Sequence, residues 1–232
     1  MLGILTLDTA FPRIRGDVGS PDTFAFPVRV ATVRGASVDA IVHGRDEAWL
    51  EPFTAAIQAL ADAGCTGVAT TCGFLARWQR ELAHASRVPV LTSSLLQVPL
   101  VRGTLAGASR VGIVTYSARD LDARALEGAG VPLDTPIEGV PGDSYFATTI
   151  RRGTDLLDRR RMSDDTVAAA RRLVEVHAGI GAIVLECANM PPYRDAVARA
   201  TGLPVFDAAQ LVAWFHAGTT LPPRDAEHAG SA

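Results

Sequence analysis

The chain has 232 residues, 48% of them hydrophobic, which is enough for one large α/β domain or two smaller lobes. A formal net charge of −3 gives no indication of the basic surface that binds nucleic acids or anionic membranes, so we expect a small-molecule partner. All 22 basic residues are arginine, and the lack of lysine excludes an enzyme that holds pyridoxal phosphate as a Schiff base.

Targeting and cofactor motifs are missing from the sequence. No apolar run approaches the roughly 20 residues of a spanning helix, and the first residues lack the basic and apolar regions of a signal peptide. We therefore expect a cytoplasmic protein with no membrane partner and with reduced cysteines. The five histidines show no ligand spacing, and the sequence has no Walker loop and no G-x-G-x-x-G, so we expect neither a metal nor a cofactor.

The first half of the chain begins with an apolar strand over residues 2–7 and a Pro/Gly-rich loop over 8–27. A loop of this length at the start of an α/β protein is typical of a functional site. The remaining elements are predicted as strands over 28–33, 40–42, 67–71 and 88–91, and as helices over 46–63, 75–85 and 93–105.

The second half shows a similar alternation. Strands are predicted over 110–115, within 131–140, and over 180–186 and 203–206, and helices over 119–129, 143–152, 163–178, 190–200 and 208–217. Ser163 is the predicted N-cap of its helix, with two acids in the first turn. The tail after Gly218 is expected to fray.

The two halves contain a repeated stretch in which a buried strand ends on a cysteine and a helix follows. With an offset of 187 − 72 = 115 residues, Cys72 aligns with Cys187, and the strand over 88–91 aligns with the strand over 203–206. The pattern predicts an α/β fold of two pseudo-symmetric lobes, each a parallel sheet flanked by helices, with the active site in the cleft between them. We assign residues 1–98 and 207–232 to the first lobe and 99–206 to the second.

Thiols at the carboxyl ends of two strands suggest proton transfer. A helix that starts directly after a thiol is expected to lower the pKa of that thiol. Two such thiols on opposite walls of a cleft form a suitable acid/base pair, with coupled titrations. A buried cysteine is usually a small core residue, and we keep this interpretation for Cys65. For Cys72 and Cys187 the repeat favours catalysis, and a reducing compartment disfavours a disulfide between them.

At Thr70-Thr71-Cys72-Gly73 and Glu186-Cys187-Ala188-Asn189-Met190-Pro191 the chain resembles the aspartate/glutamate racemase superfamily. This superfamily includes hydantoin racemases, maleate cis–trans isomerases and arylmalonate decarboxylases. The resemblance covers nearly the whole chain and implies two α/β lobes, a homodimer, and Cys72 and Cys187 as cofactor-independent bases.

The resemblance also implies the residues that bind substrate. Asp8 and Thr9 follow the first strand, where related enzymes hold an amino group. The other implied contacts are Thr115, Tyr116 and Ser117 for a carboxylate, and Thr71, Gly73, Phe74, Ala188 and Asn189 for an oxyanion. Arg13 or Arg15 is a candidate for holding a second carboxylate.

The sequence departs from two known groups, because Asn189 stands where glutamate racemases have histidine and aspartate racemases have glutamate. Our hypothesis is a cofactor-independent racemase or epimerase of amino-acid metabolism, with two-base proton transfer at the α-carbon of an amino acid or related carboxylate. The alternatives are a hydantoin racemase, a maleate-type isomerase that uses one cysteine as a nucleophile, and a two-lobed binding protein without turnover. Retention of Cys72 argues against a pure decarboxylase.

Overall fold

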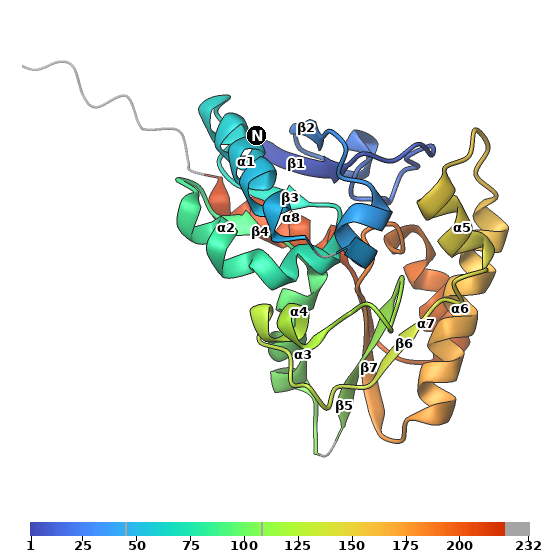
Figure 1. The fold of residues 1–232 in the computed structure, drawn as a ribbon. Coiled ribbons are helices and arrows are strands. Elements are labelled where there is room, and N and C mark those ends of the chain that lie inside the picture. Colours follow the sequence, from blue (N-terminus) through green and yellow to red (C-terminus); the bar gives the residue numbers. More distant parts are fainter. Residues whose placement is uncertain (45, 108, 221–232) are drawn as a thin grey trace, which may run out of the picture.

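Two parallel four-stranded sheets form the framework of the chain (Figure 1). The computed structural model describes residues 1–44, 46–107 and 109–220. The first sheet has the order β2-β1-β3-β4 and the second has the equivalent order β6-β5-β7-β8, so the repeat predicted from the sequence is also a repeat of topology. The strands are β1 (Leu2–Leu7), β2 (Val28–Val33), β3 (Val68–Thr70), β4 (Val90–Leu91), β5 (Arg110–Thr115), β6 (Ile137–Gly139), β7 (Ile180–Leu185) and β8 (Val205–Phe206).

The central strands are apolar on both faces because helices cover both sides of each sheet. In β1, the side chains of Leu2 and Ile4 lie in one core cluster, whereas Leu5 and Leu7 lie in the other. This alternation follows from the period of two in a strand. The edge strand β2 pairs with β1 in parallel from Leu2–Val28 to Leu7–Val33, and it is the more exposed of the two.

Helices connect the strands and complete the two lobes. The α-helices are α1 (Leu50–Asp62), α2 (Gln79–Ala85), α3 (Val98–Thr104), α4 (Ala123–Gly128), α5 (Tyr145–Arg152), α6 (Arg159–Val176), α7 (Arg194–Thr201) and α8 (Ala208–Thr219). The short elements are the 3-10 helices η1 (Pro21–Thr23), η3 (Glu47–Trp49), η4 (Gly73–Trp78), η5 (Ser94–Gln97) and η6 (Pro191–Tyr193), and the π-helix η2 (Asp39–Gly44).

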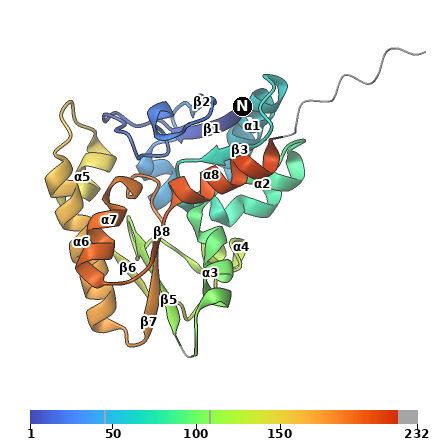
Figure 2. The same ribbon diagram turned by 180° about the vertical axis from the view of Figure 1, so that it is seen from behind.

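The last helix, α8, returns from the second sheet to the first. Figure 2 shows it beside β3 and α2, and its Leu211 and Val212 pack with Leu2 and Ile4 of β1. The Asp207 carboxylate and the Gln210 side chain form a capping box at its start. The assignment of residue ranges to the two lobes stays a prediction, and the part of the tail from residue 221 on lies outside the described residues.

The structure corrects several predicted boundaries. Residues 40–42 are not a strand but part of η2, where Ile41 and Val42 are buried, because a short apolar run does not distinguish a strand from a helix. Helix α6 begins at Arg159 rather than at Ser163, because the Asp158 carboxylate accepts the N–H groups of Arg160 and Arg161.

The helix predicted over 119–129 begins only at Ala123, where the Asp122 carboxylate provides the cap. The helices predicted over 46–63, 75–85, 93–105 and 190–200 each begin with a 3-10 turn. Within the described residues, no helix is long and apolar enough to span a membrane.

Candidate active site

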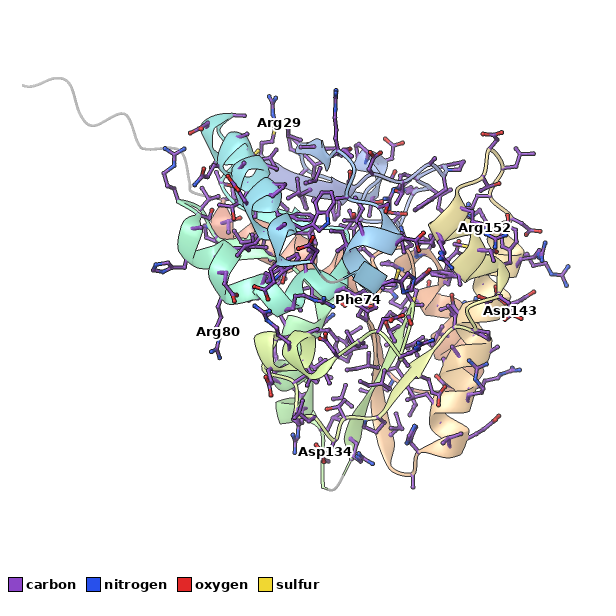
Figure 3. The ribbon with its side chains drawn as sticks, in the orientation of Figure 1. Arg29, Phe74, Arg80, Asp134, Asp143 and Arg152 are labelled. Atoms are coloured by element: carbon purple, nitrogen blue, oxygen red, sulfur yellow. The ribbon has the colours of Figure 1, made fainter. Side chains whose placement is uncertain are left out.

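Both repeated cysteines lie where the two lobes meet. Cys72 follows β3 and Cys187 follows β7 and Glu186, and each of these strands has a hydrogen-bonded neighbour on both sides. The two thiols are free and buried, and they line one pocket. Figure 3 shows Phe74, another residue of this pocket, near the middle of the molecule between the two lobes.

The pocket is lined by both lobes and by the loop after β1. Its lining residues are Leu7, Thr9, Phe11, Arg13, Val38, Val42, Thr71, Cys72, Gly73, Phe74, Tyr116, Ile150, Glu186, Cys187 and Asn189. The free volume of the pocket is about 30 Å³.

The environment of Cys72 contains opposing influences on its thiol. The backbone N–H groups of Phe74 and Leu75 and the guanidinium of Arg77 favour the thiolate. Burial and the nearby Glu186 carboxylate outweigh them and raise the pKa of Cys72 to about 12. The prediction of a lowered pKa is therefore wrong for this thiol, because the cost of burying the charge exceeds the benefit from the turn that follows.

Cys187 belongs to a hydrogen-bonded chain that reaches the loop after β1. Its thiol donates to Asn189 Oδ1 over 3.5 Å, and Asn189 Nδ2 donates to Asp17 Oδ2 over 2.6 Å. Burial first, and then Glu186 and Asp17, raise the pKa of Cys187 well above its ordinary value, so the sequence prediction is wrong here too. Both thiols need a further positive charge nearby before they can ionise readily.

Arg13 is paired with another residue of the site. Its Nη1 lies 3.1 Å from Asp17 Oδ1, its Nη2 donates to Thr9 Oγ1 over 3.0 Å, and its guanidinium lies 4.4 Å from the ring centroid of Phe11. Because Asp17 compensates this charge, Arg13 contributes little net attraction for a second carboxylate.

Glu186 is a site residue that the sequence analysis missed. Its side chain is 1% exposed, and its Oε2 accepts a 2.6 Å hydrogen bond from the Thr115 hydroxyl. Its Oε1 has no hydrogen-bond partner among the described residues. Burial raises the pKa of this carboxyl to about 7, against the opposing effect of Thr115 and the Tyr116 backbone. An acidic residue at the end of an otherwise apolar strand was the available signal.

The pocket gathers most of the residues predicted from the sequence. Of those residues, the ones that line it are Thr9, Arg13, Thr71, Cys72, Gly73, Phe74, Tyr116, Cys187 and Asn189. Asp8 is exposed and accepts the Gly35 N–H, while Ser117 bonds Asp120 in a neighbouring groove. Thr115 lies behind Glu186, and the Ala188 carbonyl accepts the Val18 N–H. The roles of all these residues stay predictions.

Other wall residues had no distinctive pattern in the sequence. These are Leu7, Phe11, Val38, Val42 and Ile150. Apolar residues on a strand end, a loop and two helices are indistinguishable from core residues until the tertiary structure brings them together. In the part of the chain that the structure describes, no three His, Cys, Asp or Glu side chains form a group that could hold a metal ion.

Comparison with known proteins identifies the family. The family model described as Asp/Glu/Hydantoin racemase matches residues 27–215, which is most of the chain. The chain belongs to this family. The family is one of enzymes that act on small carboxylates and related compounds, and the resemblance inferred from the two cysteine motifs is thereby confirmed.

Two relatives of this chain are both named as dimethylsulfoniopropionate lyases. The "Dimethylsulfoniopropionate lyase" of Durusdinium sp. clade D is 30% identical over 231 residues, which cover 96% of this chain and 76% of that protein. "Dimethylsulfoniopropionate lyase 6" of Emiliania huxleyi (strain CCMP1516) is 34% identical over 223 residues, which cover 89% of this chain. The chain spans about half of that second relative, 56% of its length.

A solved structure supports the architecture. The allantoin racemase of Klebsiella pneumoniae superimposes with a TM-score of 0.62, covering 93% of this chain and 87% of that one at 18% identity. At this identity the match concerns the fold alone. The predicted α/β fold of two parallel sheets flanked by helices is confirmed.

Proposed function

We propose that this chain is a cofactor-independent lyase that cleaves dimethylsulfoniopropionate or a closely similar sulfonium carboxylate. The observation that carries the proposal is a pair of buried thiols in a pocket without an uncompensated positive charge. Arg13 is the one cationic side chain among the described residues that line the pocket, and Asp17 pairs with it. The names of the two relatives point to the same substrate.

The electrostatics of the pocket favour a substrate that brings its own cation. Glu186 and burial raise the pKa of both Cys72 and Cys187, so a bound sulfonium would lower these pKa values and promote thiolate formation. Phe74 adds an aromatic ring to the pocket wall, a kind of group to which a cation can bind. Aspartate or glutamate also carries a cation, its ammonium group, but brings a second carboxylate and so a net negative charge to a pocket that already contains acidic groups.

The reaction needs one base and a leaving group. A thiolate takes the proton from the carbon next to the carboxylate, and the C–H electron pair becomes the new carbon–carbon double bond. The C–S bond breaks with its electron pair on sulfur, so the cationic sulfonium leaves as neutral dimethyl sulfide and the chain becomes acrylate. We assign the base to Cys72, because the N–H groups of Phe74 and Leu75 stabilise its thiolate. The proton on the thiol is finally released to solvent.

The test is direct. Purified protein is incubated with dimethylsulfoniopropionate, and dimethyl sulfide in the headspace and acrylate in solution are measured. Cys72→Ser removes the base and is expected to lower kcat/KM at least about 100-fold, whereas Cys187→Ser leaves that base in place and is expected to lower it less. Cys65→Ser is the matched control, since Cys65 is buried but does not line the pocket. Wild-type rates in both pocket variants, or no product from the wild type, would refute the proposal.

A racemase or epimerase of small amino acids or related carboxylates is the second candidate. It is favoured by the equivalent positions of Cys72 and Cys187 in the two lobes, which suit a base on each side of a carbon. Deuterium uptake from D₂O is measured on single enantiomers of aspartate, glutamate and hydantoins, and on maleate, for which a thiol adduct would appear by mass spectrometry. Uptake at an α-carbon that vanishes in both cysteine variants would favour this candidate. Binding without turnover would indicate a binding protein.

The homodimer and the cytoplasmic location expected from the sequence also belong to this proposal. Sedimentation velocity at micromolar concentrations tests the first, and fractionation of the source cells tests the second. A monomer over the whole concentration range would exclude the dimer.

A further inference from the structure

The two oxygens of the Glu186 carboxyl group differ in their hydrogen bonds. Oε2 accepts the Thr115 hydroxyl over 2.6 Å, and the Tyr116 backbone N–H also bonds this carboxyl. Oε1 is buried without a hydrogen-bond partner among the described residues. An unpartnered buried polar atom in a pocket wall is costly and calls for a ligand.

The position of Oε1 is defined by Gly73. A Cβ atom at Gly73 would clash with Oε1 and would lie 2.9 Å from Ser93 Oγ. Only glycine leaves room for the carboxyl here, directly after Cys72 and at the start of η4. Glu186 and Gly73 both line the pocket, so the Glu186 carboxyl group forms part of its wall.

The hydrogen bonds indicate which oxygen carries the proton in the neutral acid. Oε2 already accepts a donor, so the proton is better placed on Oε1, whose O–H then lacks an acceptor. A buried carboxylic acid kept neutral in this way can serve as a hydrogen-bond donor to a developing oxyanion. Burial raises the pKa of Glu186 to about 7, so the neutral form predominates below that pH.

We propose that Glu186 is a catalytic residue that donates a hydrogen bond from protonated Oε1 to the carboxylate of the substrate. This inference rests on the proposed function. When the thiolate removes the neighbouring proton, negative charge builds up on the carboxylate oxygens, and this donor stabilises it. The proton stays on Glu186, so no additional acid is consumed. Glu186 thereby provides the contact to the substrate carboxylate that Arg13 does not provide, because Arg13 is paired with Asp17.

Other charged and titratable groups face this part of the pocket from every packed element. They are Cys72, Arg77, Tyr116 and Cys187 on the Glu186 side, Arg13 and Asp17 from the loop after β1, and Asp39, His43, Asp120 and Arg151 around Tyr116. Burial raises the pKa of both thiols and of Tyr116, so these three stay neutral between pH 6 and 8. The Glu186→Gln variant therefore separates the contribution of Glu186 from that of the other groups.

The experiment uses propionate, a carboxylate without a leaving group, so that binding is measured apart from turnover. Calorimetric titration at pH 6 and pH 8 is expected to show about a ten-fold weaker Kd at pH 8, because the protonated fraction of Glu186 falls about ten-fold. Glu186→Gln keeps a donor in this place but does not titrate, so its Kd is expected to change less than about two-fold. The inference is overturned if both proteins show the same pH dependence.

A second variant keeps the inference testable if Glu186→Gln fails to fold. Thr115→Val removes the donor to Oε2 at similar volume, and since that hydrogen bond lowers the pKa of Glu186, the midpoint of the binding-versus-pH curve is expected to move to higher pH. A midpoint that stays in place or moves to lower pH counts against the inference.

Failure of this inference differs from failure of the proposed lyase. Cysteine-dependent release of dimethyl sulfide together with pH-independent propionate binding would refute the role of Glu186 and leave the lyase standing. Propionate binding that follows Glu186, without any release of dimethyl sulfide, would support Glu186 as a carboxylate donor and refute the lyase.

Discussion

Replacing Asp17 by alanine removes the acceptor that ties the loop after β1 to the Cys187 side of the pocket. Asp17 is 3% exposed, and its carboxylate accepts from Asn189 Nδ2 over 2.6 Å and from the Gly19 N–H over 2.7 Å. It also pairs with Arg13 at 3.1 Å. In the variant, two buried donors and one largely buried cation lose their acceptor together.

The expected loss follows from the burial of these groups. Breaking a buried ion pair by removing one partner costs about 3–5 kcal/mol, and the 19% exposure of the Arg13 side chain places this case near the lower limit. We expect a loss of about 3 kcal/mol in the free energy of unfolding, which for a chain of this size lowers Tm by about 6–12 °C. Asn189 also loses its anchor, so kcat/KM for the preferred substrate is expected to fall as well.

Urea unfolding followed by tryptophan fluorescence measures the change. Asp134→Ala is the matched control, because Asp134 is exposed at the end of the second lobe (Figure 3) and its loss is expected to stay within about 0.5 kcal/mol. Equal stabilities of Asp17→Ala and Asp134→Ala would show that the network contributes nothing in solution. The assignment of Arg13 as a compensated charge would then fail.

Two further predictions concern Glu186 and Gly128. Because burial raises the pKa of Glu186 from 4.5 to about 7, the folded chain binds more protons than the unfolded chain between these values. The free energy of unfolding is therefore expected to fall by about 3 kcal/mol as the pH rises from about 4.5 to 7, and urea titrations should show no such term in Glu186→Gln. Gly128→Ala places a Cβ against the Ala76 carbonyl and is expected to lower Tm by several degrees in a thermal scan, unlike an alanine at the open site Gly103.

The architecture is largely determined by the sequence alone. A parallel strand buried on both faces is a continuous apolar run, and the helix that follows it has apolar residues at a period of about 3.6. Because this pattern occurs twice, around Cys72 and Cys187, it predicted both the two lobes and the paired thiols. Helix starts were less predictable. Asp158 rather than Ser163 caps α6, because several polar residues compete for one cap and packing selects among them.

The electrostatics of the pocket are decided only by the tertiary structure. Asp17 and Asn189 are 172 residues apart in the chain, and Glu186 meets Gly73 from the opposite lobe. No local pattern encodes such contacts. Their burial also reverses the predicted effect on the thiols, because removing a charge from water outweighs the turn that follows each cysteine. The sequence therefore locates the reacting groups, whereas the assembled lobes set their charge state.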